Sequence, residues 1–203
     1  MRGPRPTRSD AGRAVSRAWS DILHAPVPPS SPTFIVREAV ERDHAPVAQV
    51  LQLAFGGSQE AELVAALREA NALSILLVAL SNDTEVVGCV ALSSVSTPDC
   101  ASATAGLGLA PLAVTPAHQR KGLGHALMHR ALELARERGA GFVVLLGSPA
   151  YYARFGFRAA STWGLRCVFD APAEAFQALE LEPGALSHTR GIVRYHAAFE
   201  RFE

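Results

Sequence analysis

Two glycines and two basic residues stand together in the middle of the chain, at a spacing that suits the binding of phosphate. Residues 119–124 read Gln-Arg-Lys-Gly-Leu-Gly. Glycine lets the backbone approach a ligand closely and adopt positive φ without strain. An apolar, strand-like segment over residues 107–114 precedes this turn, and an amphipathic helix is expected to begin near Leu123. The free N–H groups at that helix start, its dipole, and the charges of Arg120 and Lys121 predict a pyrophosphate-binding turn.

Spacing excludes two other phosphate-binding motifs. A P-loop needs Gly-x-x-x-x-Gly-Lys-Ser/Thr, and the sequence contains no such string. The dinucleotide-binding fingerprint needs a third glycine three residues after the second, and Leu127 occupies that position.

The turn resembles the Gln/Arg-x-x-Gly-x-Gly/Ala loop of the GNAT superfamily of acetyl-CoA-dependent N-acetyltransferases, and Val114 and Pro116 also match the family pattern. A second match lies at residues 149–157, Pro-Ala-Tyr-Tyr-Ala-Arg-Phe-Gly-Phe, where Tyr152 begins the family's Tyr-x-x-x-Gly-Phe motif. Two ordered motifs are more specific than either one. Together with Gly-Leu-Ala-Pro-Leu-Ala-Val before the turn, they resemble one bacterial GNAT subgroup.

The resemblance implies roles for residues on both sides of the turn. Backbone groups of residues 112–114 would pair with the pantetheine arm as an added strand, and one N–H group would donate to the thioester oxygen. The turn itself would hold the pyrophosphate. The cofactor-binding residues expected for acetyl-CoA are therefore Leu112, Ala113, Val114, Gln119, Arg120, Lys121, Gly122, Leu123, Gly124 and His125.

Tyr152 is the expected catalytic general acid, which protonates the thiolate of coenzyme A as it leaves. With reference pKa values of ~10 for tyrosine and ~8.5 for a thiol, this transfer is uphill by about 2 kcal/mol. That deficit is small beside the ~10²- to 10⁴-fold contribution of a positioned acid. A packed tyrosine with its hydroxyl satisfied elsewhere is the alternative. Tyr151 lies about 100° further round a helix and is interpreted as a packing residue.

The sequence leaves the general base open. Many GNAT members carry a glutamate on the strand before the turn, but residues 106–114 contain no acid. Glu60, Glu62 or His196 could act through water, or a weakly basic acceptor amine could arrive already neutral.

The histidines favour solvated positions over a metal site. His125 and His129 are four residues apart, which is a metal-ligand spacing on a helix. No third ligand lies near them in sequence, and both fall on the polar stripe of the expected helix. His118, inside the turn, either approaches phosphate or is an ordinary loop residue. We expect no metal cofactor.

Composition indicates one packed domain without a nucleic-acid or membrane partner. The 203 residues are 49% hydrophobic, and 19 basic residues balance 19 acidic ones. Zero formal charge disfavours a nucleic-acid footprint. No apolar run approaches the ~18 residues of a membrane span. The three cysteines form no Cys-x-x-Cys pair, which favours a reducing, cytoplasmic location.

Residues 1–33 are rich in arginine and proline and are interpreted as a flexible N-terminal arm and linker. A cleaved transit peptide is the alternative. It is disfavoured because an Ala/Arg/Pro/Gly-rich composition runs through the whole chain. Residues 34–203 are expected to form the acetyltransferase domain.

The apolar patterns of this domain predict the order β-α-α-β-β-β-α-β-α-β. Asp43 is the expected N-cap of the first helix, and residues 82–83 are the expected turn of a hairpin. The predicted fold is α/β (mixed α+β): a twisted, mostly antiparallel sheet of GNAT type with helices on both faces. The phosphate-binding turn then lies at the carboxyl end of a strand, where α/β sheets bind ligands.

The expected activity is transfer of the acetyl group of acetyl-CoA to a primary amine, by direct attack in a ternary complex. The alternatives are a non-catalytic acyl-CoA sensor, an acyltransferase that uses a longer acyl chain, and a phosphate-binding domain unrelated to coenzyme A. The acceptor is a small-molecule or peptide amine. Its specificity is assigned to the early helices, residues 97–104 and the C-terminal third, and either a monomer or a homodimer is compatible with the sequence.

Overall fold

The computed structural model describes residues 34–97, 105–187 and 189–202. The expected N-terminal arm lies outside these residues, and so do residues 98–104 of the loop to which part of the acceptor specificity was assigned. Within the described ranges, no helix has the length and apolar content needed to cross a bilayer.

A seven-stranded sheet forms the centre of the fold, with the strand order β1-β2-β3-β4-β5-β8-β6. Neighbouring strands are antiparallel except β4 and β5, which are parallel, and β7 and β9 form a separate two-stranded parallel sheet. This arrangement confirms the predicted fold class. The strands are β1 (Phe34–Glu38), β2 (Leu73–Ser81), β3 (Glu85–Val95), β4 (Ala105–Val114), β5 (Ala140–Leu146), β6 (Arg158–Ala159), β7 (Leu165–Cys167), β8 (Phe176–Glu180) and β9 (Gly191–Val193).

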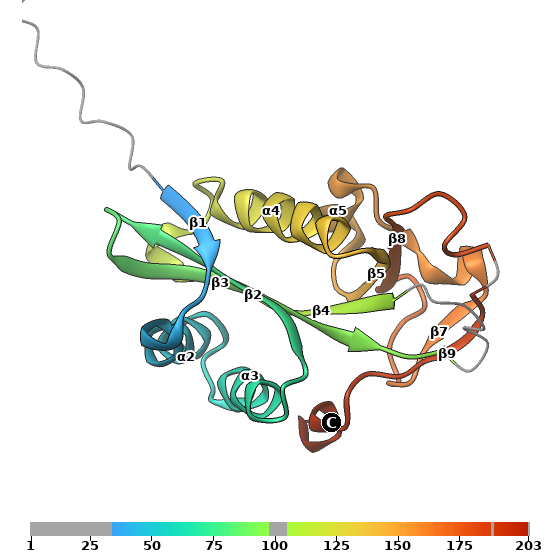
Figure 1. Ribbon diagram of the computed structural model, residues 1–203, viewed down its shortest axis with the longest axis horizontal. Helices are drawn as coiled ribbons and strands as arrows, with labels where there is room; N and C mark the ends of the chain where they lie inside the picture. The colour runs from blue at the N-terminus through green and yellow to red at the C-terminus, as the bar shows by residue number, and fades with distance from the viewer. Residues whose placement is uncertain (1–33, 98–104, 188, 203) are drawn as a thin grey trace, which may run out of the picture. The chain divides into compact units, whose positions relative to one another are not determined.

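Helices cover both faces of this sheet, as predicted (Figure 1). The α-helices are α2 (His44–Phe55), α3 (Gln59–Glu69), α4 (Leu123–Glu137) and α5 (Pro149–Tyr152). The 3₁₀-helices are η1 (Glu41–Asp43), η2 (Pro116–His118), η3 (Ala153–Phe155), η4 (Ala160–Trp163) and η5 (Ala197–Phe202).

Each face has its own apolar core. Helix α4 buries a stripe that includes Leu127 and Ala131 against one side of the sheet, because its apolar residues recur every three to four positions. Helices α2 and α3 bury Val50 and Val64 against the other side, together with Cys89 of β3. The candidate site described below is formed by the edges of β4 and β5 together with residues from the helices on the two faces of the sheet.

The hairpin between β2 and β3 confirms the turn prediction. Asn82 and Asp83 have φ values of 49° and 64°. Two consecutive residues with positive φ are typical of a type I′ turn, whose twist matches that of the flanking strands.

The sequence missed two strands in the C-terminal third. Strands β6 and β7 are two and three residues long. Such segments are too short to show an alternating pattern, so the expected order lacked them. The two strands that follow, β8 and β9, are five and three residues long.

Asp43 occupies the predicted N-cap position of α2, but its side chain makes no capping bond to that helix. Its carboxylate accepts hydrogen bonds from the Val40 N–H at 2.7 Å and from the Arg37 guanidinium at 2.5 and 2.9 Å. The carboxylate therefore joins β1 to the segment that leads into α2. The hydrogen bond from Arg37 lowers the pKa of Asp43 below its ordinary value, by more than burial raises it.

We predict that Asp43→Asn lowers the free energy of unfolding by about 1–3 kcal/mol at pH 7, because it weakens bonds to two buried or partly buried donors. The pKa of Asp43 is lowered in the folded state. Its contribution is therefore complete above the ordinary aspartate pKa of ~4 and is lost as the pH falls below that value. Urea unfolding should show a smaller gap between wild type and variant at pH 3 than at pH 7. A gap of equal size at both pH values would contradict this assignment, and Asp83→Asn in the exposed hairpin turn is the matched control.

Candidate active site

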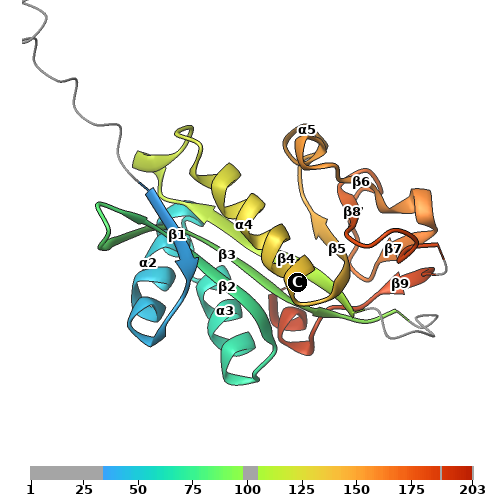
Figure 2. The ribbon, with the colours of Figure 1, turned by 45° about the horizontal axis from the view of Figure 1, so that its top comes forward.

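The central strands β4 and β5 separate half-way along the sheet. Strand β4 pairs with β3 from Gly106 to Val114, but with β5 only from Ala105 to Gly108. Figure 2 shows the two strands diverging from a common end. Beyond Gly108, one edge of β4 therefore faces no neighbouring strand.

The direction of the main-chain N–H and C=O groups alternates along β4, and this decides which residues present them at the open edge. The N–H of Thr115 donates to the Val87 carbonyl of β3 at 2.9 Å. The main-chain N–H and C=O groups of successive residues in a strand face opposite edges. Leu112 and Val114 therefore direct their N–H and C=O groups away from β3. Ala113 directs its own toward β3, and its side chain is buried. Of the three predicted pantetheine contacts, two thus lie on the open edge and one on the paired edge.

The predicted pyrophosphate turn directly follows β4 and leads into α4. Arg120 and Gly122 have φ values of 60° and 87°, and Gly122 is the N-cap of α4 without a side-chain cap. The buried Leu123 side chain anchors the turn in the core. The first N–H groups of a helix, here including those of Gly124 and His125, have no acceptor within the helix. The turn therefore presents free donors at the positive end of the α4 dipole.

Side chains brace this turn from within. The Gln119 side-chain amide donates to the Val114 carbonyl at 3.0 Å. Thr115 Oγ1 and His118 Nδ1 form a hydrogen bond of 2.9 Å. Of the two roles considered for His118, this bond favours the structural one. Arg120 and Lys121 are both exposed at the same turn.

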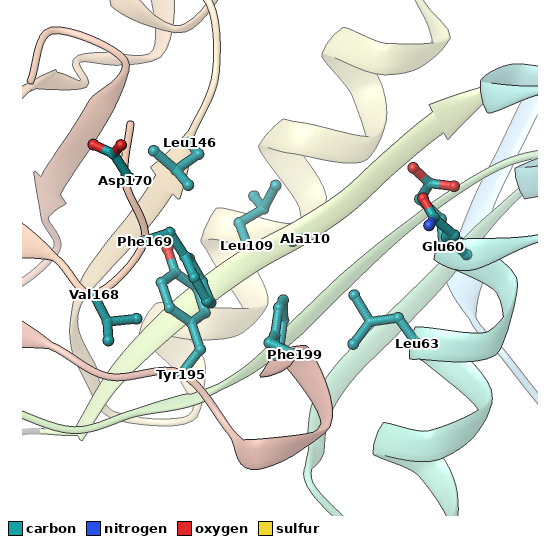
Figure 3. Close-up of a pocket in the computed structure, with 11 residues that line it drawn as sticks. Glu60, Leu63, Leu109, Ala110, Leu146, Val168, Phe169, Asp170, Tyr195 and Phe199 are labelled. Atoms are coloured by element: carbon teal, nitrogen blue, oxygen red, sulfur yellow. The ribbon is translucent and has the colours of Figure 1, made fainter. Parts of the chain in front are cut away.

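A pocket of about 820 Å³ opens where β4 and β5 separate (Figure 3). Leu109 and Ala110 of β4 line it immediately beyond the last residue paired with β5, and Leu146 lines it from the end of β5. Three further segments complete it: the first turns of α3, the segment after β7, and the C-terminal residues before and within η5. Their lining residues are Gln59, Glu60, Leu63, Val168, Phe169, Asp170, Tyr195 and Phe199.

Residues 35–160 match the family model for the acetyltransferase (GNAT) domain. The chain belongs to the GNAT family. It is similar to the uncharacterized N-acetyltransferase YhbS of Escherichia coli strain K12, with 36% identity over 169 residues that make up 83% of this chain and all of the relative. This GNAT chain is therefore an acyltransferase of the N-acetyltransferase type.

Two solved structures of GNAT proteins resemble the fold. The structure of E. coli YhbS in complex with CoA has a TM-score of 0.81 and 35% identity, covering 89% of this chain and 98% of that one. A Brucella melitensis GNAT acetyltransferase in complex with acetyl-CoA has a TM-score of 0.68 and 35% identity, covering 82% and 98%.

Tyr152 of this GNAT enzyme lies just beyond the end of β5. Its ring packs directly on Gly147, where any added Cβ would overlap Cε2 of the ring, and lies 5.9 Å from the Phe157 ring. Gly147 is itself held in place, because its carbonyl accepts a bond of 3.1 Å from the buried Gln177 side chain. Burial raises the pKa of Tyr152 to about 12.

Tyr151 does more than the packing role that the sequence predicted. Its ring packs against Phe155 and under the Arg154 guanidinium, with centroid distances of 5.7 and 4.9 Å. Its hydroxyl also lies over Gly124, where a Cβ would stand only 2.7 Å from the hydroxyl oxygen. Tyr151 thus brings a polar group to the first turn of α4. The only sequence signal for this was the pair of adjacent tyrosines.

Of the three candidate bases, Glu60 alone lines the pocket. Glu62 is exposed and accepts a hydrogen bond from the Ser58 hydroxyl at 2.6 Å. His196 Nδ1 accepts from the Ala198 N–H at 3.1 Å and lines a smaller, separate cavity. Asp170, the second carboxylate in the pocket, was missed because it lies in the weakly patterned C-terminal third.

Three aromatic side chains form one wall of the pocket. The Tyr195 ring lies 5.4 Å from Phe169 and 5.0 Å from Phe199 between centroids. It lies over Gly108, where a Cβ would stand 2.5 Å from Tyr195 Cε1. Burial raises the pKa of Tyr195 above the ordinary range, so its hydroxyl stays protonated.

The histidine stripe on α4 lies away from the pocket. The rings of His125 and His129 are 4.3 Å apart and pack beside Phe155, and both residues are exposed. Over the described ranges, no three potential metal ligands cluster together.

Proposed function

We propose that this GNAT enzyme transfers the acetyl group of acetyl-CoA to a primary amine by direct attack in a ternary complex. The observation that carries the proposal is the separation of β4 from β5, with a pocket at the point of separation and a turn rich in free donors at the far end of β4. An extended cofactor can then lie along the open edge, with its phosphates at the turn and its acyl group at the pocket. The complexes of the two relatives with CoA and acetyl-CoA support this choice of ligand.

The cofactor would be held mainly by the main chain. Gly122, Gly124 and the neighbouring N–H groups would bind the pyrophosphate, with Arg120 and Lys121 neutralising its charge. Leu112 and Val114 would pair with the pantetheine arm from the open edge of β4. Ala113, the remaining predicted contact, would contribute by packing that edge against α2.

The reaction then needs three assisted steps. The amine lone pair attacks the thioester carbonyl carbon, and a main-chain N–H on the open edge stabilises the developing oxyanion. The C–S bond breaks as the tetrahedral intermediate collapses, and Tyr152 donates its proton to the departing sulfur. Before the attack, Glu60 removes a proton from the incoming ammonium, directly or through water. The second proton, which the nitrogen loses as the amide forms, replaces the one that Tyr152 gave to sulfur, by way of solvent. No metal takes part in this scheme.

The raised pKa of Tyr152 makes protonation of the sulfur harder than the reference values suggest. A pKa of about 12 lies further from that of a free thiol than the ordinary tyrosine value does. Desolvation disfavours every anion, so burial of the sulfur beside Tyr152 would raise the thiol pKa as well. Proton transfer within this dry region is therefore less uphill than a comparison of the raised Tyr152 pKa with that of a free thiol in water implies.

We also propose that the chain belongs to the GNAT subgroup carrying Pro-Ala-Tyr-Tyr-x-Arg-Phe-Gly-Phe, and that its catalytic domain covers residues 34–203. A cytoplasmic location suits its odd cysteine count and its cofactor.

Gly124→Leu should abolish acetyl-CoA binding, because a side chain at this position displaces the Tyr151 hydroxyl and fills the mouth of the turn. Acetyl-CoA at 100 times its dissociation constant should stabilise the wild-type protein by about 2.7 kcal/mol. Thermal unfolding with and without acetyl-CoA measures this shift. The matched control is Gly57→Ala, since Gly57 has open space around it. A normal shift in Gly124→Leu would remove the turn from cofactor binding.

Tyr152→Phe should lower kcat by about 10²- to 10⁴-fold, because the leaving thiolate loses its proton donor. Affinity for acetyl-CoA, measured by calorimetry, should stay the same, since the ring that packs on Gly147 is retained. Release of free thiol in the presence of an amine measures turnover. Unchanged turnover would show that another group protonates the sulfur.

Glu60→Gln should lower kcat/KM at pH 7 by about 10- to 100-fold, within the usual range for a general base. The difference from wild type should shrink as the pH rises toward the pKa of the amine, because the acceptor then arrives neutral. Glu69→Gln is the control, since Glu69 lies on the same helix but outside the pocket. A rate loss that is the same at every pH would contradict the role of Glu60 as base.

A further inference from the structure

The lining of the β4–β5 pocket is mostly apolar. Eight of its eleven residues are apolar or aromatic, two are carboxylates, and none of the eleven is basic. Its volume of about 820 Å³ falls within the ~300–1,000 Å³ typical of sites for small organic ligands. Such a pocket can hold the acyl end of a cofactor together with a compact acceptor.

Part of the apolar lining is exposed in the free protein. Leu146 and Val168 are 38% and 40% exposed, which places them among the large apolar side chains with the highest exposure in the described residues. Both lie at the Asp170 end of the pocket, close to Phe169 (Figure 3). Covering apolar surface of this kind favours binding, so this end fits an apolar group of the acceptor.

The negative charge of the pocket bears on the polar group of the acceptor. Glu60 and Asp170 lie on opposite sides of it, with the aromatic wall between them (Figure 3). Two carboxylates without a basic residue among the lining attract an ammonium ion and repel a carboxylate or phosphate. The pocket therefore favours a cationic amine without a nearby acidic group.

The same lining disfavours very polar amines. A sugar amine would bury several hydroxyl groups against apolar side chains, and each one without a hydrogen-bond partner is costly. A long polyamine carries no apolar body that would cover the exposed side chains of Leu146 and Val168. Neither kind of molecule matches this mostly apolar lining.

We propose that the acceptor is a small primary amine on an apolar body of about aromatic size, with no carboxylate beside the amine. This inference rests on the proposed function, because it takes the pocket at the β4–β5 separation as the acceptor site. The apolar body lies against Val168, Leu146 and Phe169, and the combined negative charge of Glu60 and Asp170 disfavours acidic analogues.

A matched pair of amines tests the proposal directly. Phenethylamine and phenylalanine share their aromatic body and differ by one carboxylate. With acetyl-CoA as donor, thiol release should give a kcat/KM for phenethylamine at least tenfold above those for phenylalanine, glucosamine and spermidine. Equal or better use of phenylalanine, glucosamine or spermidine would overturn the inference while leaving acetyl transfer itself established.

Two exposed positions make the test specific to the pocket. Asp170→Asn should reduce the preference for phenethylamine over phenylalanine at least threefold. Val168→Thr keeps the side-chain shape but adds a hydroxyl, and it should lower kcat/KM for phenethylamine several-fold. Glu174→Gln and Val40→Thr are controls of matched type outside the pocket, and Val40 is 46% exposed against 40% for Val168. An unchanged preference in Asp170→Asn and an unchanged kcat/KM in Val168→Thr would overturn the inference.

A separate measurement distinguishes failure of this inference from failure of the proposed function. If no amine releases thiol, the proposed function fails. Calorimetric titration of phenethylamine into the protein saturated with CoA then decides the inference. Binding that is weakened by Val168→Thr supports the pocket as a site for apolar amines, and absence of binding overturns it.

Discussion

The separation of β4 from β5 beyond Gly108 is the constraint on which the site depends. A parallel pair that stayed together would satisfy its own main-chain groups and leave no edge for a ligand. Because β3 still pairs with β4 as far as Val114, with one register shift between Leu109 and Leu112, the open edge is held in place by its other neighbour. The fold therefore leaves main-chain groups of β4 unpaired along this edge, with the turn before α4 at one end and the pocket at the other.

Three contacts between a glycine and a tyrosine lie around the gap between β4 and β5. Each tyrosine of the chain lies against a glycine: Tyr151 over Gly124, Tyr152 on Gly147, and Tyr195 over Gly108. At each position a Cβ would collide with the ring or its hydroxyl. These glycines therefore serve close packing as much as backbone freedom. Only Gly124 had a role expected from the sequence, since its motif marks it for contact with phosphate.

The parts that the sequence predicted are those encoded locally. The turn at residues 119–124, the hairpin turn at Asn82 and the stripe of α4 each follow from neighbouring residues, and the structure has all three. The pocket could not be predicted, because α3, β4, the segment after β7 and the C-terminus meet only through long-range packing. Asp170 shows this most clearly. No pattern surrounds it in the sequence, yet it supplies one of the two carboxylates of the pocket.

The packing that positions Tyr152 also opposes its use as an acid. The ring is fixed between Gly147 and Phe157, and the resulting desolvation raises its pKa to about 12. A buried, fully protonated hydroxyl is a poor acid toward water but a strong hydrogen-bond donor to an anion that lacks water of its own. Sulfur that leaves into the gap beside β5 would be such an anion. In the proposed mechanism, Tyr152 would therefore protonate the sulfur only after the C–S bond has largely broken, when the negative charge on sulfur is greatest and the pKa mismatch with Tyr152 is smallest.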